Sequence, residues 1–313
     1  LRPQLLLHRH VHRRAPGLPR EAPGRVIIRG PGAVLRPFVR LLWASEPGEA
    51  AGAESGPLCW ERMLPSGLAH VVLRLSGPPL QLLPATSASG VQLIRSGVVG
   101  GPRSGAYIKQ VADAETVGAE LCAGATLALL GVPGRQLAET HTPLDDLLGG
   151  VTQAWCDELR ALPSAAQRLQ RFEALLMSRL RERALHPAVR HALARFSAPH
   201  AASVSEVVAE SGYSHRRFLT LFEEATGIAP KRFTRVLRFR RTLEAFQRGE
   251  VGREGLGALA AALGYADQAH LTREFREHAG ITPARYQKVQ PEQVFHLPLS
   301  EAPEFTGVPI DSR

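Results

Sequence analysis

The chain has 313 residues, of which 44% are hydrophobic, and its formal net charge is +9 at pH 7. A chain of this length and apolar content can bury the cores of about two domains. No apolar run approaches the ~18 residues of a membrane span, so the sequence favours a cytoplasmic protein without a membrane partner.

Residues 1–25 are rich in Arg and Pro and show no helical or strand periodicity. Such a composition predicts a disordered extension rather than part of a folded core. The segment begins with Leu instead of Met, so a misplaced start is a second interpretation, and a basic arm that binds nucleic acid is a third.

Residues 26–160 contain short apolar segments of strand length, at 68–75, 91–99 and 106–112, which are separated by clusters of Gly, Pro and Ser. Many short strands with turn residues between them indicate a sandwich or a barrel. The region has only two histidines, His70 and His141, which lie far apart in the sequence. No phosphate-binding or dinucleotide-binding motif is present either, so we expect no metal, no cofactor and no enzyme activity.

The three cysteines, Cys59, Cys122 and Cys156, are widely spaced and form no Cys-x-x-Cys pair. Their odd number and spacing predict neither a disulfide framework nor a zinc site. Buried free thiols in a reducing compartment are favoured over a catalytic thiol.

Residues 161–185 change to a helical period. Leu169, Phe172, Leu176 and Leu180 form one apolar stripe, and Ser164 stands where an N-cap is expected. The pattern predicts a connector helix that ends before Pro187.

Residues 186–289 contain nearly the same pattern twice. The stretch GYSHRRFLTLFEEATGIAPKRF begins at Gly212, and GYADQAHLTREFREHAGITPARY begins at Gly264. In each copy an apolar helical stripe precedes the glycine and a second stripe follows it, and glycine enters a left-handed turn at low cost. Two short helices joined by a tight glycine turn are typical of a helix-turn-helix unit, with Ser214 and Asp267 as the expected caps of the second helices.

The alternative is a helical repeat that only packs against itself. Such solenoids need about three repeats to be stable, whereas two copies occur here. Residues 186–290 also hold sixteen basic residues against ten acidic ones, which favours a polyanionic partner. We therefore favour DNA binding over a purely structural repeat.

These residues resemble the C-terminal DNA-binding domain of AraC/XylS-type bacterial transcription regulators, and the second copy has Gly-Tyr, His-Leu and Gly-x-Thr-Pro in register. The resemblance implies two helix-turn-helix units joined by a long helix near residues 231–247. It further implies a β-rich, jelly-roll or cupin-like sensory domain in the front half. The expected fold class is α+β. The expected divisions are an extension (1–25), a β-rich sensory domain (26–160), a connector (161–185), an all-α DNA-binding domain (186–289) and a flexible tail (290–313).

Polar and basic residues that lie off the apolar stripes of this domain are expected to contact bases or phosphates. An arginine in this position can bind guanine through two hydrogen bonds or hold a phosphate, and the sequence leaves both roles open. For the histidine beside Leu271, a packing or backbone contact is favoured over base reading. The candidates are His215, Arg216, Arg217, Thr220, Lys231, Arg235, Gln268, His270, Thr272, Arg273 and Arg276.

The linking helix carries a group of basic residues, and they cannot all face DNA, because successive residues of a helix point in different directions. Some of them must be surface charges or partners in ion pairs.

The sequence thus predicts a sequence-specific transcription regulator that reads two consecutive major-groove segments. Its expected partners are double-stranded promoter DNA, RNA polymerase and a small-molecule effector held by the N-terminal domain. A homodimer is left open, because no heptad pattern is visible. Two alternatives remain: an interaction protein whose degraded module no longer reads DNA, and a DNA-modifying enzyme that uses the module for targeting.

Overall fold

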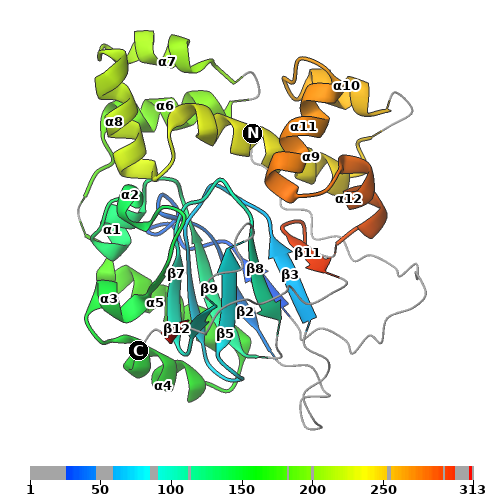
Figure 1. The fold of residues 1–313 in the computed structure, drawn as a ribbon. Helices are drawn as coiled ribbons and strands as arrows, with labels where there is room; N and C mark the ends of the chain where they lie inside the picture. Colours follow the sequence, from blue (N-terminus) through cyan, green and yellow to red (C-terminus); the bar gives the residue numbers. More distant parts are fainter. Residues whose placement is uncertain are drawn as a thin grey trace.

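The computed structural model describes residues 26–46, 59–84, 91–111, 114–181, 183–198, 201–251, 255–291, 293–299 and 310–311. The extension expected at residues 1–25 lies outside these ranges. Within them a β-rich domain is followed by a helical domain, and Figure 1 shows helices α6 to α12 arching across one end of the sheets.

The β-rich domain contains two six-stranded sheets. All pairings in them are antiparallel except that of β12 with β6. The first sheet has the order β1 (Val26–Arg29), β2 (Val39–Ser45), β9 (Thr116–Leu121), β4 (His70–Arg74), β7 (Gly97–Gly100) and β10 (His141–Pro143). The second has the order β11 (His296–Leu299), β3 (Cys59–Met63), β8 (Tyr107–Val111), β5 (Leu80–Pro84), β6 (Gln92–Ile94) and β12 (Ile310–Asp311).

One face of the first sheet is covered by helices. The core there joins Val71, Leu73 and Val117 of the strands to Leu169 and Phe172 of a helix, all of them fully buried. Burial of aliphatic and aromatic side chains at this scale is the main source of stability for the domain. The helices of this region are α1 (Thr126–Leu130), α2 (Gly134–Leu137), α3 (Leu144–Leu148), α4 (Thr152–Arg160) and α5 (Ala165–Arg179).

Helix α5 lies within residues 161–185, for which the sequence predicts a connector helix. Its predicted cap is confirmed, because the side chain of Ser164 accepts a hydrogen bond from the backbone N–H of Gln167. The predicted stripe is buried against the first sheet, since Leu169 and Phe172 are 0% exposed. The helix is therefore an integral part of the core of the β-rich domain.

The helical domain has two cores, one at each end of the long helix α9 (Pro230–Gln247). The first gathers Phe218, Phe222 and Phe233, and the second gathers Phe239 and Phe275. The other helices of the domain are α6 (Pro187–Ser197), α7 (Val204–Ser211), α8 (His215–Thr226), α10 (Gly255–Ala262), α11 (Gln268–Ala279) and α12 (Pro283–Val289). This arrangement confirms the expected α+β class, with helix-turn-helix units on either side of a long helix.

The chain returns to the β-rich domain after α12. Strand β11 pairs with β3, opposite residues Trp60 to Met63. Its Leu297 is 2% exposed and packs in the second helical core. The sequence predicts a flexible tail from residue 290, whereas residues 296–299 form a strand. The strand forms because these residues pair with β3, which lies far from them in sequence, and because Leu297 is buried.

Candidate DNA-binding interface

Each helix-turn-helix unit turns at a glycine whose backbone is left-handed. Gly212 ends α7 with a φ of 72°, and Gly264 follows α10 with a φ of 78°. Neither position is crowded, since a Cβ at either would meet nothing within 4 Å. The glycines are therefore needed for their backbone conformation rather than for close packing.

The first recognition helix, α8, is oriented by a cap and two buried rings. Ser214 accepts a hydrogen bond from the backbone N–H of Arg217, as the sequence predicts. Phe218 and Phe222 are 0% exposed on the inner face. The opposite face of its first two turns presents exposed polar and basic side chains, namely His215, Arg216, Arg217 and Thr220.

The second recognition helix, α11, repeats this construction. Asp267 accepts from the backbone N–H of His270 at 2.6 Å, and Leu271 and Phe275 are fully buried. Thr272 is half-buried, and its hydroxyl donates to the carbonyl of Gln268 at 2.9 Å. The exposed candidates on this helix are Gln268, Arg273 and Arg276.

His270 is engaged within its own unit. Its Nδ1 accepts a hydrogen bond from the backbone N–H of Ala266 at 3.2 Å, and its ring lies edge-on to Tyr265 with centroids 5.5 Å apart. Its Nε2 lies 3.8 Å from the carboxylate of Glu274. The side chain thus supports the turn before α11.

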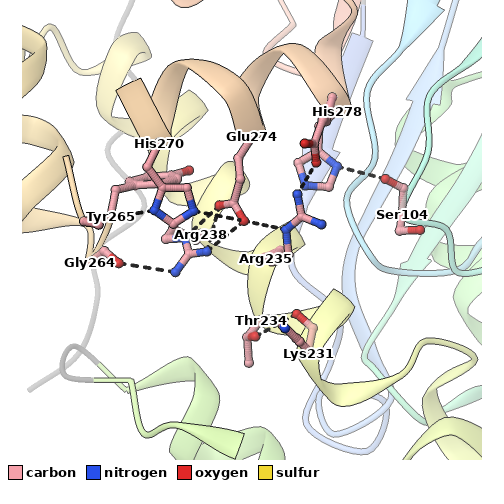
Figure 2. A network of polar contacts seen from close by, with 12 residues as sticks. Ser104, Lys231, Thr234, Arg235, Arg238, Gly264, Tyr265, His270, Glu274 and His278 are labelled. Carbon is pink, nitrogen blue, oxygen red and sulfur yellow. Dashed lines mark hydrogen bonds and ion pairs between the residues drawn. The ribbon is translucent and has the colours of Figure 1, made fainter. Parts of the chain in front are cut away.

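Glu274 anchors α11 to the linking helix. Its side chain is 4% exposed. One carboxylate oxygen forms an ion pair with Nη2 of Arg238 at 2.7 Å, and the other forms a second ion pair with Arg235 (Figure 2). Burial favours the protonated acid, but the hydrogen bonds from Arg235 and Arg238 outweigh it, so the pKa of Glu274 lies below its usual value. Arg235 also pairs with Glu277. Sequence reasoning missed Glu274, because no local pattern marks a buried carboxylate whose partners lie on another helix.

The basic group on α9 is divided among several roles. Arg235 and Arg238 hold Glu274, and Arg241 donates to the backbone carbonyls of Phe196 and Ala198. Among the candidates on this helix, Lys231 is exposed whereas Arg235 is committed to its two carboxylates. Part of the basic group is therefore engaged in ion pairs within the protein, as the sequence predicts.

A cavity of about 620 Å³ lies between the β-rich domain and helices α6 and α9. Among the described residues, its walls carry five arginines and one carboxylate, from Glu244, together with apolar side chains such as Phe38, Leu193 and Leu237. Burial lowers the pKa of Arg240, and nearby Arg40 lowers it further. Within the described residues, the side chains of Arg183 and Arg190 have no hydrogen-bond or ion-pair partner. The lining arginines are Arg40, Arg183, Arg190, Arg240 and Arg241.

The two histidines of the β-rich domain are close in space, contrary to the expectation from their sequence separation. Both His70 on β4 and His141 on β10 pair in register with Gly100 of β7. A terminal nitrogen of Arg103 lies 3.4 Å from Nδ1 of His141. Burial, together with the positive charge of Arg103, lowers the pKa of His70 to about 3. Strand order brings them together, which the sequence does not reveal. Across the described ranges, no three His, Cys, Asp or Glu side chains cluster as they would around a metal ion.

Two further observations concern the described helices and the cysteines. Among the helices that the structure describes, none combines the length and apolarity needed to cross a membrane. Among the described residues, Cys59, Cys122 and Cys156 form no disulfide, and burial raises the pKa of Cys156 to about 11, which disfavours a reactive thiolate at that position.

Comparisons with known proteins point to the same region. Residues 207–289 match the family model described as a helix-turn-helix domain. An AraC-type transcriptional regulator from Chromobacterium violaceum is 21% identical with a TM-score of 0.30, covering 34% of this chain and 94% of that one. The C-terminal domain of AraT, a response regulator from Geobacillus stearothermophilus, is 19% identical with a TM-score of 0.30, covering 34% and 88%.

A structure of ToxT from Vibrio cholerae covers 84% of this chain and 98% of its own, at 8% identity and a TM-score of 0.43. No curated protein sequence matches the chain significantly. The family match to residues 207–289 identifies this part of the chain as a helix-turn-helix domain, in agreement with the paired units on α9.

Proposed function

We propose that the protein reads two consecutive major-groove segments of promoter DNA, one with α8 and one with α11. The observation that carries this proposal is the repeated construction of the two helices, each with a capped N-terminus, a buried aromatic face and an exposed polar face. Helix α9 has 18 residues and is therefore about 27 Å long, a length comparable to one turn of B-DNA.

The exposed side chains divide into two roles. Arg216, Arg217, Arg273 and Arg276 carry the positive charge, and Lys231 adds to it at the start of α9. Contacts of such groups with phosphates supply affinity that falls with salt, whereas contacts with base edges supply specificity. His215, Thr220, Gln268 and Thr272 complete the proposed interface. His270 and Arg235 position α11 without touching the DNA.

The cavity between the domains is the proposed effector site. Its excess of guanidinium groups over carboxylates suits a carboxylate or phosphate, because arginine binds such groups through paired hydrogen bonds. Its apolar wall suits a ligand with a hydrophobic body. Since Leu237 and Arg240 of α9 line the cavity, a bound molecule would contact the helix that joins the two units. RNA polymerase and a second copy of the chain remain predicted partners.

The test is selection of sites from random duplex DNA by the full chain at two salt concentrations. We expect enrichment of a two-part site with half-sites about 10 base pairs apart. The double variant Arg216→Ala, Arg273→Ala should lose the enriched site. A matched control, Arg36→Ala with Arg171→Ala, removes two exposed arginines from the β-rich domain and should retain it. Absence of any enriched or salt-dependent binding would reject the proposal and favour a protein partner instead.

A further inference from the structure

The β-rich domain grips the C-terminal end of the first recognition helix. A Cβ at Gly134, in α2, would lie 2.6 Å from the carbonyl oxygen of Ala225 and 2.8 Å from the backbone nitrogen of Gly227. Gly227 ends α8, and a Cβ there would lie 2.6 Å from the carbonyl oxygen of Gly134 and 3.0 Å from Pro102. Two backbones therefore meet at a distance that only glycine permits on both sides. In Figure 1 helix α2 lies directly beneath α8.

The same domain also holds the C-terminal end of the second recognition helix. His278, in the last turn of α11, is 5% exposed, and its Nδ1 donates to the carbonyl oxygen of Ser104 at 2.9 Å (Figure 2). The guanidinium of Arg62 packs against Gly280, which ends α11. The contact is thus made at the same end of both recognition helices.

The two contacts belong to one hydrogen-bonded unit. Pro102 touches the end of α8, and Ser104, two residues later, holds α11. Glu139, just after α2, accepts from the backbone N–H and the hydroxyl of Ser104 at 2.7 and 2.8 Å and donates its own N–H to the carbonyl of Pro102 at 3.0 Å. We call residues 101–105, together with residues 134–140, which include helix α2, the bridging loops. They connect the ends of α8 and α11 without passing through α9.

These contacts leave the proposed reading surface open. Arg216 lies in the first turn of α8 and Gln268 in the first turn of α11, at the ends opposite to the bridging loops. Both side chains are exposed. The contacts therefore constrain the positions of α8 and α11 without covering their exposed faces. They form a second connection between the two helices, in addition to the covalent one through α9.

We propose that the bridging loops set the separation of the two recognition helices, so that residues outside the helix-turn-helix units determine which half-site spacing is bound. This inference rests on the proposed reading of two groove segments. A rigid separation favours one spacing, because a shift of one base pair moves a half-site along the groove and rotates it around the duplex. Without the second connection, α9 alone would tolerate neighbouring spacings.

Two variants release the contacts separately. Gly134→Val places a side chain against the end of α8, and the φ of Gly134 is not among the positive values that would strain a side chain there. His278→Phe removes the hydrogen bond to Ser104 and retains an aromatic ring against Phe239, whose centroid lies 4.9 Å from that of the histidine. Gly30→Val is the matched control, because a Cβ at Gly30 meets nothing within 4 Å.

The measurement is the affinity of each full-length variant for duplexes in which the two half-sites are moved apart in steps of one base pair. We expect the wild type and Gly30→Val to lose about one order of magnitude in affinity at one step from the best spacing, the size of a mismatched base pair. Gly134→Val and His278→Phe should bind neighbouring spacings within about threefold of each other, while the preferred sequence of each half-site stays the same.

The proposal is overturned if both variants keep the wild-type spacing profile, or if the wild type binds all spacings equally well. Thermal unfolding of each variant establishes that its spacing profile is measured on folded protein. The two substitutions lie in different domains, so if one variant does not fold, the other still tests the proposal. A wild type that binds no duplex would instead reject the proposed function itself.

Discussion

Arg238 donates from one terminal nitrogen to both oxygens of Glu274, at 2.9 and 2.7 Å, across the junction of α9 and α11. The same arginine lies over the ring of Tyr265, 4.7 Å from its centroid. A planar guanidinium can stack on the ring with its face while its edge donates to the carboxylate, a geometry that the compact ammonium of lysine does not reproduce. The orientation of the second recognition helix therefore depends on an ion pair that no DNA contact requires.

Glu274→Gln should lower the free energy of unfolding by about 2 kcal/mol, because it weakens charge-assisted hydrogen bonds to a side chain that is almost fully buried. Chemical denaturation of the full chain measures the change. Glu277→Gln is the control, since Glu277 is exposed and its loss should change stability by less than about 0.5 kcal/mol. Equal effects of the two substitutions would contradict the anchoring role.

Arg276→Ala should reduce the slope of log DNA affinity against log salt concentration by about 1, the value for one lost phosphate contact. Arg235→Ala should leave that slope unchanged and lower stability instead, because Arg235 is held by Glu274 and Glu277. Titrations of one duplex over a range of salt concentrations separate the two outcomes. A reduced slope for Arg235→Ala would place that residue on the DNA after all.

Gly264→Ala should destabilise the protein by roughly 1 to 2 kcal/mol, because the alanine must adopt the left-handed conformation of this turn. Gly257→Ala, within α10, should instead stabilise the protein by about 0.5 to 1 kcal/mol, since a helical glycine loses more entropy than alanine. Thermal melts of the pair give the comparison. A neutral Gly264→Ala would show that the turn can relax without a left-handed residue.

Arg240→Gln should abolish binding of an apolar carboxylate in the cavity between the domains. The probe is 2-naphthoate, and uncharged 2-naphthylmethanol is its control. We expect the carboxylate to raise the melting temperature of the wild type in a concentration-dependent way, as any ligand of the folded state does. Equal shifts with the carboxylate and the alcohol would indicate apolar binding without a role for the arginines.

Acid should weaken the attachment of β11 through Glu61. Burial favours the protonated acid, but hydrogen bonds from His296 and Lys109 outweigh it and lower the pKa of Glu61 from 4.5 to about 2. A carboxyl group with a depressed pKa in the folded state contributes stability above its unfolded pKa and loses it as the pH falls. We therefore expect stability to decline between pH 4.5 and 2, with a smaller decline in Glu61→Gln. Denaturation midpoints across this range test the difference, and parallel curves would contradict it.

Local signals in the sequence are sufficient for much of the helical domain. The caps at Ser214 and Asp267, the glycine turns and the two apolar stripes follow from neighbouring residues alone, and the structure confirms them. Pairings between distant segments are not encoded in this way. The approach of His70 to His141, the burial of Glu274 and the docking of Leu297 each depend on strand order or on packing between helices.

For the candidate site, the sequence identifies which helices are exposed but not which arginines are free. Arg216 and Arg235 have the same chemistry and lie on adjacent helices, yet only the second is paired with two carboxylates. The sequence around Gly134 does not show why a glycine is needed there either. The need comes from the close approach of the backbone at Ala225 and Gly227, more than 90 residues away in sequence.

Strand β11 joins one edge of the second sheet, beside β3, only after the chain has passed through the helical domain. In order of synthesis, the DNA-binding domain therefore behaves as an insertion between two parts of the β-rich domain. During translation the backbone edge of β3 stays unpaired until residues 296–299 emerge, and unpaired edges are sites of aggregation. A chain cut at residue 290 would keep every proposed DNA contact and still leave its β-rich domain unfinished.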